Sequence, residues 1–406
     1  MTKLSESETS DSTQMSKTPY PGAEDESTVE WLNRLLGGSV ASKDAASGSS
    51  TQVEYLYRPN AAHPTLLIPI GHRAVTASAL RRFHDSRTKQ MTAINLASPF
   101  IGHAHVARRV GGEVRRHPQF ELIDYLAMKL GEPALFASVI LGPKRRNRKP
   151  VIQLIRPDGI VVGFAKLGWS DLTKRLVQNE CEILRSTEAT FPHPIQAPRV
   201  LLEETTPDGR QIVVTSAVQN GPFARRKGPL SLDFVLSLAR SLSGGMLPIS
   251  QLPYADMWRQ NSIVGPFVDR AISVHGADSR LEVGLWHGDL TPWNTSTTRR
   301  KMAIWDWEFA GKDRPIGFDL LHDVFETHRR TEGTDLDAAL RSMVADGTTR
   351  LSTLTESTDT IIDLYLCELL YRELELEGQR WESATVQKSA DALQHLLTQR
   401  LGGDNR

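Results

Sequence analysis

Cysteine is scarce in this chain, and the scarcity limits the chemistry that it can carry. Only two of the 406 residues are cysteines. Cys181 and Cys367 lie far apart in the sequence and lack the close spacing of cysteines that bind one metal ion together. A low cysteine content also suits a reducing compartment. We therefore expect no cysteine-based metal site.

The chain also lacks a net charge and a long apolar run, and we expect it to have no signal peptide. Its 48 Lys and Arg residues balance 48 Asp and Glu residues, so no overall field draws it to nucleic acid or to a membrane surface. No uninterrupted apolar run is long enough to cross a bilayer. The first residues are polar, without the apolar core of a signal peptide. We expect a soluble, cytoplasmic protein that binds neither nucleic acid nor a membrane.

A short window near residue 290 is rich in polar side chains that suit phosphate chemistry. Asp289 follows an apolar run, and Pro292 separates it from Asn294 and prevents a regular helix. Residues 302–305 predict a short buried strand that places Asp306 at its end. Phosphoryl transfer needs a carboxylate that accepts a proton from the attacking hydroxyl, together with oxygen ligands for Mg²⁺. Asn and Asp supply the oxygen ligands that Mg²⁺ prefers.

The two motifs of this window, His-Gly-Asp-Leu-x-Pro-x-Asn and Ile-x-Asp-Trp-Glu, resemble those of aminoglycoside phosphotransferases and choline kinases. Those proteins are small-molecule kinases with a protein-kinase-like fold. The resemblance implies that Asp289 deprotonates the acceptor hydroxyl, while Asn294 and Asp306 bind Mg²⁺. It also implies that His287 and Asp319 support the site structurally. The alternative is a loop whose Asp and Asn only cap helices, which does not explain the second motif.

A lysine on a predicted strand offers a partner for phosphate. Lys166 lies in the apolar stretch 160–167, where an ammonium group is costly unless it reaches an opposite charge. The next helix can supply that charge, because Glu180 shares the apolar face of Leu184 whereas Glu182 is rotated away. We predict a Lys166–Glu180 pair. The resemblance implies that the lysine holds the α- and β-phosphates; the alternative is an edge-strand lysine that reaches solvent.

Two further segments concern the nucleotide. Residues 217–222 resemble the hinge between the lobes, and adenine is expected to bond to backbone groups near Ser216 and Val218. The implied cofactors are Mg²⁺ and ATP, although the sequence does not distinguish ATP from GTP. The hairpin turn 142–150 carries five cations, which either contact phosphate or form an exposed basic turn.

The resemblance implies a fold class that is α+β and bilobal, with a small antiparallel sheet over a mainly helical lobe. Residues 1–51 read as a disordered polar tail with one short helix around Trp31, which either docks on the body or remains marginal. Residues 52–133 form an extra α/β segment of unknown role. The kinase-like N-lobe covers 134–221, and the helical C-lobe with the catalytic loop covers 222–406.

The regions beyond the hinge are predicted to be mostly helical. Residues 230–242, 254–274, 361–376 and 384–401 each show helical apolar spacing. Four acids at and after the third stretch either form a solvated face or bind a cationic substrate, as they do in relatives. They are Glu368, Glu373, Glu375 and Glu377.

Together these features predict an ATP- and Mg²⁺-dependent phosphotransferase. It moves the γ-phosphate to a hydroxyl of a small molecule of the aminoglycoside, amino alcohol or sugar type. The alternative is a non-catalytic kinase-like protein that binds a nucleotide or a protein partner, with protein contact through the N-terminal segment. A protein kinase is disfavoured, because the motif is His-Gly-Asp and no Ala-Pro-Glu follows.

Overall fold

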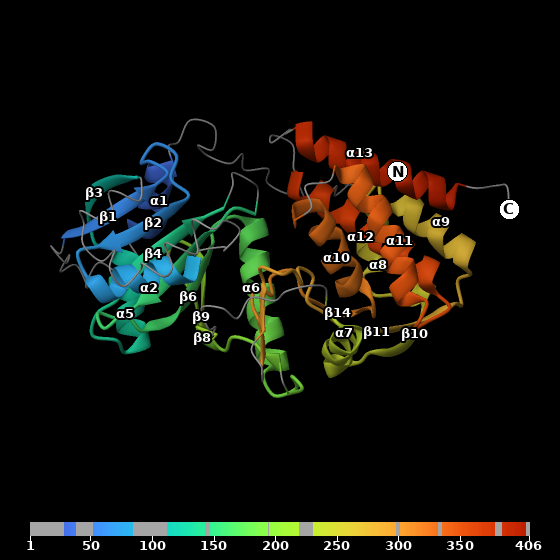
Figure 1. Cartoon of the computed structure of the whole chain (residues 1–406), viewed down its shortest axis with the longest axis horizontal. Helices are drawn as coiled ribbons and strands as arrows, with labels where there is room; N and C mark the ends of the chain where they lie inside the picture. Colours follow the sequence, from blue (N-terminus) through green and yellow to red (C-terminus); the bar gives the residue numbers. More distant parts are fainter. Residues whose placement is uncertain are drawn as a thin grey trace, which may run out of the picture.

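The computed structural model has two lobes, one rich in strands and one mainly helical (Figure 1). It describes residues 28–37, 52–83, 112–142, 147–193, 195–218, 230–297, 301–331, 335–377 and 384–402. The expected α+β, bilobal fold class is therefore confirmed. Within the described ranges, no helix is both long and apolar enough to span a membrane.

The strand-rich lobe, called the N-lobe below, is built on one eight-stranded antiparallel sheet. Its strand order is β3-β1-β2-β4-β5-β6-β9-β8. Segment 52–133 supplies the first three of these strands, and β2 pairs directly with β4. The segment therefore extends the sheet that strands β4, β5, β6, β9 and β8 form. The strands are β1 Gln52–Arg58, β2 Leu66–Ile70, β3 Glu113–Pro118, β4 Phe136–Leu141, β5 Pro150–Ile155, β6 Val161–Gly168, β8 Val200–Thr205 and β9 Gln211–Ser216.

Helices cover both faces of this sheet, because its strands alternate buried side chains between the faces. On one face, α1 (Thr28–Gly37) and α5 (Glu121–Leu130) pack on a cluster that includes Ala165 and Leu167 of β6. On the other, α2 (Arg73–Phe83) packs on a smaller cluster of apolar side chains. Helix α6 (Asp171–Thr187) also contacts β6 and β9, through Val213 on the face that carries Lys166.

Helix α1 is docked on the N-lobe, so its interpretation as a marginal helix in a flexible tail was wrong. Trp31 is 6% exposed and meets Trp169 edge-on at 5.7 Å between ring centroids. The guanidinium of Arg148 lies 4.7 Å from the ring centroid of Trp31. Arg210 also donates a hydrogen bond to the carbonyl of Leu35. The other residues of 1–51 lie outside the described ranges.

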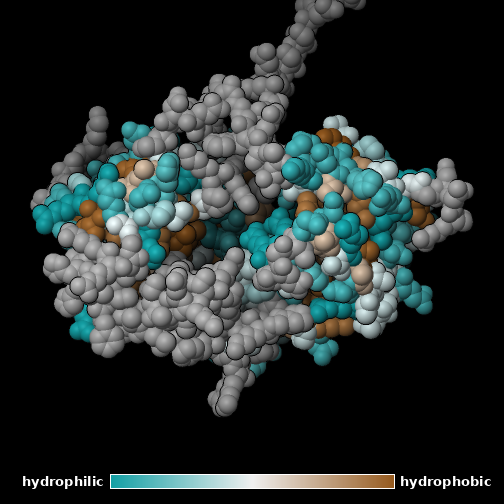
Figure 2. Space-filling view, turned by 45° about the horizontal axis from the view of Figure 1, so that its top comes forward, coloured by the Kyte–Doolittle hydropathy of each residue, from teal (hydrophilic) through white to brown (hydrophobic). Residues whose placement is uncertain are grey.

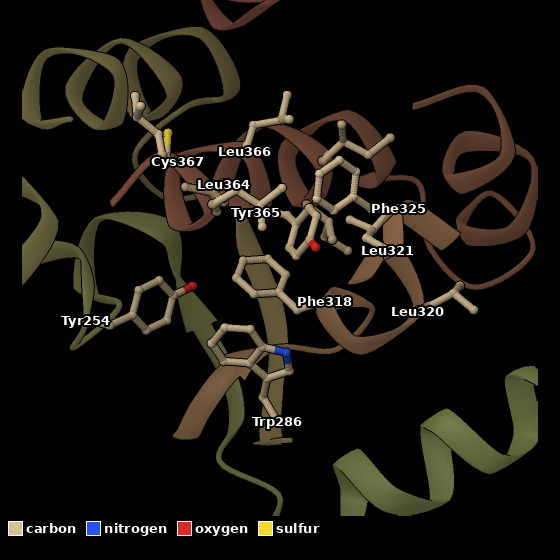
Figure 3. Close-up of a cluster of buried hydrophobic side chains, with 14 of the residues drawn as sticks. Tyr254, Trp286, Phe318, Leu320, Leu321, Phe325, Leu364, Tyr365, Leu366 and Cys367 are labelled. Atoms are coloured by element: carbon tan, nitrogen blue, oxygen red, sulfur yellow. The ribbon is translucent and has the colours of Figure 1, made fainter. Parts of the chain in front are cut away.

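The second lobe, called the C-lobe, surrounds a core of aromatic and aliphatic side chains (Figure 3). Two small sheets lie on either side of the loop at residues 287–294, with the orders β10-β11-β14 and β12-β13-β7. The elements are β7 Ile195–Gln196, α7 Leu232–Ala239, η2 Arg240–Leu242, β10 Gly245–Pro248, η3 Ile249–Gln251, α8 Ala255–Arg259, α9 Gly265–His275, β11 Arg280–Trp286, β12 Thr295–Thr297, β13 Met302–Ile304, β14 Gly311–Pro315, α10 Phe318–Glu326, η4 Thr327–Thr331, α11 Leu336–Leu351, α12 Thr358–Glu377 and α13 Ala384–Leu401.

The single helix predicted over 254–274 is instead two helices, α8 and α9. Asn261 lies between them, and its Oδ1 accepts hydrogen bonds from the backbone N–H groups of Ile263 and Val264. A short amide side chain that bonds to the backbone in this way competes with helix hydrogen bonding. Pro266 then stands at the start of α9, where its missing N–H costs nothing.

Candidate active site

The loop that carries Asp289, residues 287–294, follows β11, and a buried carboxylate holds its backbone. Asp319, in the first turn of α10, accepts hydrogen bonds from the backbone N–H groups of His287 (2.9 Å) and Gly288 (3.0 Å). Burial raises the pKa of Asp319 to about 7, although both N–H donors favour its ionised form. Gly288 has φ 84°, and a Cβ there would lie 2.4 Å from the carbonyl oxygen of Phe309. Only glycine fits this close approach.

His287 braces the loop from inside. It is fully buried, its Nδ1 accepts a hydrogen bond from the N–H of Asp289 at 3.1 Å, and its Nε2 lies 3.2 Å from the carbonyl of Trp305. Nε2 therefore carries the ring proton. Burial lowers the pKa of His287 to about 3. The ring is thus neutral at pH 7, and both of its nitrogens form hydrogen bonds to backbone groups.

Asp289 receives a donor on each carboxylate oxygen. Asn294 donates from Nδ2 to Oδ2 of Asp289 at 2.8 Å and to its backbone oxygen at 3.0 Å. His322 Nε2 lies 3.2 Å from Oδ1. Burial, followed by the charge of Asp306, raises the pKa of Asp289 to about 7, while Arg330 acts in the opposite direction. A carboxylate with such a pKa is suited to accept a proton near neutral pH.

Asp306 stands beside this carboxylate in an unusual backbone conformation. It follows β13 with φ 72°, a left-handed value that is rare for a residue other than glycine and is typical of functional sites. Antiparallel pairing of Thr295 with Ile304 brings Asn294, before β12, close to Asp306. Burial opposes ionisation of Asp306, but the charges of Lys166 and Lys149 outweigh it and lower its pKa to about 2.

Lys166 joins the two lobes at the site. Its Nζ lies 2.6 Å from Glu180 Oε2 on α6 and 2.5 Å from Asp306 Oδ1 in the C-lobe. The predicted Lys166–Glu180 pair is therefore confirmed. Burial alone would lower the pKa of Lys166, but Asp306, Glu180 and Glu308 raise it above its usual value. The lysine is thus held charged, with its ammonium group beside Asp306.

Helix α6 presents Glu180 because its start is well defined. Ser170 caps the helix, and Thr173 completes a reciprocal capping box. Gly168 precedes the cap, and a Cβ at that position would lie 2.6 Å from the Cα of Lys174. The backbone can therefore turn directly from β6 into α6, which aligns Lys166 with Glu180.

Two charged residues that lie beside Lys166 and Asp306, namely Glu308 and Lys149, were not identified from the sequence as site residues. Glu308 is buried and forms an ion pair with Lys149, and its Oε2 also lies 3.8 Å from Lys166. Burial, partly offset by Lys149, raises the pKa of Glu308. The Trp-Glu sequence after Asp306 was a signal for Glu308. Lys149 belongs to the basic turn 142–150, of which residues 143–146 lie outside the described ranges.

Two side chains of the site, Asn294 and Asp306, offer oxygen atoms that suit a Mg²⁺ ion. Carboxylate oxygens of Glu180, Asp306 and Glu308 all lie within 4.8 Å of one another, but the ammonium group of Lys166 lies among them, 2.6 Å from Glu180 and 2.5 Å from Asp306. Nδ2 of Asn294 donates its hydrogen bonds to Asp289, so Oδ1 is the atom of this amide that could bind a metal ion. The side chain of Asp306 is 36% exposed and can be reached from outside. Hard oxygen ligands of this kind are those that Mg²⁺ selects.

The residues expected near adenine lie at the end of β9. Ser216 pairs with Gly163 of β6, and its hydroxyl accepts a hydrogen bond from the N–H of Arg199 at 2.9 Å. Val218 is buried, at 3% exposure. The rest of the expected hinge, residues 219–222, lies outside the described ranges. Adenine binding at Ser216 and Val218 stays a prediction.

The acids of α12 do not form a simple solvated face. Glu368 is buried and accepts a hydrogen bond from Nε of Arg372 at 2.9 Å, so the solvated interpretation was wrong for it. Glu375 accepts one from Arg175 of α6 at 2.6 Å. Both acids line a pocket of about 410 Å³ between α6 and α12. The visible surface where the two lobes meet is largely hydrophilic (Figure 2).

Comparison with known proteins finds similarity in solved structures alone. No family model and no curated protein matches the chain. A thermostable mutant of aminoglycoside phosphotransferase APH(4)-Ia, solved with ADP and hygromycin B, is 13% identical with a TM-score of 0.45. The match covers 70% of this chain and 100% of that one.

Two other solved structures are similar to this chain. Aminoglycoside phosphotransferase APH(2'')-IIIa, in complex with GDP and kanamycin, is 15% identical with a TM-score of 0.41, over 69% of this chain and 98% of that one. A fructosamine-3-kinase from Haemophilus somnus is 12% identical with a TM-score of 0.36, over 68% and 96%. At identities of 12–15%, these likenesses concern the fold alone.

Proposed function

We propose that this protein is an ATP- and Mg²⁺-dependent phosphotransferase that moves the γ-phosphate to a hydroxyl group of a small molecule. One observation carries the proposal. A carboxylate whose pKa is about 7 lies beside a second carboxylate and an amide, and a buried lysine with its paired glutamate meets them from the other lobe. Helix capping requires only a side chain and the nearby backbone, so it does not explain why a lysine from the other lobe meets these groups.

Each residue has a distinct role in the proposed transfer. Asp289 orients the acceptor hydroxyl and takes its proton as the oxygen attacks the γ-phosphorus and ADP leaves. Asn294 and Asp306 would hold Mg²⁺, which when bound neutralises charge on the phosphate oxygens. Lys166, positioned by Glu180, holds the α- and β-phosphates. Catalysis then depends mainly on placement and charge neutralisation.

The lysine must exchange partners when nucleotide binds. Lys166 Nζ now lies 2.5 Å from Asp306, and binding of a magnesium nucleotide would shift that contact towards phosphate. Glu180 remains 2.6 Å away and keeps the ammonium group oriented. We expect the acceptor to be a hydroxyl compound of the aminoglycoside, amino alcohol or sugar class.

The test is Mg²⁺-dependent ADP release from ATP across a panel of amino alcohols, sugars and aminoglycosides. We expect turnover with at least one acceptor, and loss of kcat by about 10²- to 10⁴-fold in Asp289→Ala, the size of a lost general base. ATP affinity should stay within about twofold, since Asp289 is assigned to the acceptor. Asp278→Ala, at an exposed aspartate, is the matched control.

The alternative is a kinase-like protein that binds nucleotide without transferring phosphate. Tight ATP binding with no turnover on any hydroxyl compound would support it and would overturn the proposed function. The same conclusion would follow if Asp289→Ala had the activity of the unaltered protein.

A further inference from the structure

We infer that His322 is a positioning residue for Asp289, with Tyr365 setting the tautomer of its ring. The inference rests on the proposed function, in which Asp289 is the proton acceptor. It concerns a hydrogen-bonded chain, Tyr365–His322–Asp289, that runs from the core of the C-lobe to the carboxylate.

The three groups come from separate elements and meet inside the lobe. His322 of α10 is 6% exposed, and Tyr365 of α12 is fully buried. The Tyr365 hydroxyl lies 2.8 Å from Nδ1 of His322, and Nε2 of His322 lies 3.2 Å from Oδ1 of Asp289. Tyr365 stands among apolar side chains that include Phe318 and Phe325 (Figure 3). The packing leaves the histidine ring little freedom to rotate.

The tautomer of the ring follows from satisfying a buried hydroxyl. The phenol of Tyr365 has one proton, and His322 Nδ1 is its hydrogen-bond partner. Since a buried donor without an acceptor costs about 1–3 kcal/mol, the hydroxyl donates and Nδ1 accepts. Nε2 therefore carries the ring proton and donates it to Asp289 Oδ1. Burial lowers the pKa of His322 to about 3, so the ring donates as a neutral group.

A metal-binding role for His322 does not fit these contacts. The adjacent acid, Asp323, is buried and accepts a hydrogen bond from the N–H of Leu230 at 3.0 Å. Neighbouring positions of a helix point in different directions. Both ring nitrogens of His322 are already used, one on Tyr365 and one on Asp289.

The consequence is a carboxylate fixed at both oxygens. Asn294 donates to Oδ2 and His322 donates to Oδ1, which defines the plane of the Asp289 carboxylate. Asn294 is also assigned to the proposed Mg²⁺ site. Of the two donors to the Asp289 carboxylate, His322 is therefore the one that is not assigned to Mg²⁺ as well. When the base is already held in one orientation, less conformational entropy is lost as the complex with the acceptor reaches its reactive geometry.

The kinetic test compares His322→Leu, His322→Gln and Tyr365→Phe. We expect His322→Leu to lower kcat about tenfold to a hundredfold, with both KM values within about twofold. His322→Gln, whose amide can donate to Asp289, should recover most of kcat. Tyr365→Phe should give an intermediate kcat, because both ring tautomers become populated. Unchanged kcat in His322→Leu, or no recovery in a folded His322→Gln, would overturn the inference.

A second measurement does not depend on turnover. In protein labelled with ¹⁵N-histidine, the His322 signals are those missing from His322→Gln, and their pattern reports which ring nitrogen is protonated. We expect protonation at Nε2, and a mixture of tautomers in Tyr365→Phe. Protonation at Nδ1 would overturn the inference even if no acceptor were ever found. Absence of turnover in the unaltered protein, with Nε2 protonated, would count against the proposed function alone.

Discussion

At the scale of single residues, the pKa of each carboxylate in the site depends on the balance between its burial and the charges beside it. Asp306 carries a pKa near 2 because Lys166 and Lys149 outweigh its burial. Asp289 has a pKa of about 7 because burial and the charge of Asp306 both disfavour its ionised form. Two carboxylates of the same type thus have pKa values on opposite sides of the ordinary aspartate value, because their neighbours differ in charge.

The pH dependence of kcat/KM for the acceptor should follow Asp289. A base must be ionised to act, so we expect kcat/KM to rise with pH through about 7 and level off above it. Arg330 favours the ionised form, and its removal in Arg330→Gln should move the inflection to higher pH. Steady-state kinetics between pH 5.5 and 9, in steps of about half a unit, measure both. A flat profile would contradict the assignment of Asp289 as the base.

The buried pair Lys149–Glu308 should behave as a coupled unit. Lys149→Met leaves the charge of Glu308 buried beside one remaining cation, and breaking such a pair costs about 3–5 kcal/mol. The double variant Lys149→Met/Glu308→Gln should recover part of that loss, since no buried charge is left without its partner. Urea unfolding of the single and double variants measures the coupling. Additive losses would show that the two side chains act independently.

At the scale of elements, helix α1 supports the turn that carries Lys149. Trp31 packs on Arg148 and Trp169, and the indole N–H of Trp169 donates to the carbonyl of Arg148 at 2.9 Å. Residue 149 follows directly and reaches Glu308 in the other lobe. The helix is therefore connected to the site through two consecutive residues of the β4–β5 turn.

Removal of the Trp31 side chain should weaken both the N-lobe and the site. We expect Trp31→Ala to lower the free energy of unfolding by about 3–5 kcal/mol, as for other buried aromatic side chains, and to raise KM for ATP. Met128→Ala, on helix α5 of the same lobe, where the side chain is 65% exposed, is the control and should change stability by less than about 0.5 kcal/mol. Equal stability of the two variants would mean that α1 is not held by Trp31.

At the scale of the whole molecule, charged contacts join the lobes across the site. Lys166 and Lys149 belong to the N-lobe, whereas Asp306 and Glu308 belong to the C-lobe. Asn179 of α6 adds neutral links, because its Nδ2 donates to the carbonyls of Glu308 and Ala310. Ligands that bind at this junction should therefore stabilise the molecule as one unit.

A non-hydrolysable ATP analogue with Mg²⁺ should raise Tm in a concentration-dependent way. Ligand present at a hundred times its Kd adds about 2.7 kcal/mol to the stability of the folded state. In Asp306→Asn, the part of this shift that requires Mg²⁺ should be lost while the part seen with nucleotide alone remains. Calorimetry with and without Mg²⁺ separates the two parts. An unchanged Mg²⁺ effect in the variant would exclude Asp306 as a ligand.

Much of the candidate site was predictable because its residues are close in sequence or share one helix face. Asp289, Asn294 and Asp306 lie within one short stretch, so their order and the turn at Pro292 already favour convergence. Glu180 follows from the apolar spacing of its helix. The break between α8 and α9 was missed, because Asn261 acts through its side chain on the local backbone, which apolar periodicity does not record.

The sequence by itself determined the loop of Asp289 and the lysine–glutamate pair, because local spacing decides which face of an element a side chain occupies, and the resemblance of its two motifs led to the α+β, two-lobed architecture. Only the tertiary structure decided that α1 docks on the N-lobe, that Lys149 reaches Glu308, and that His322 and Tyr365 stand behind Asp289. Those contacts depend on which faces of distant elements meet. Packing of the whole molecule determines which faces meet, and a local sequence pattern carries no information about it.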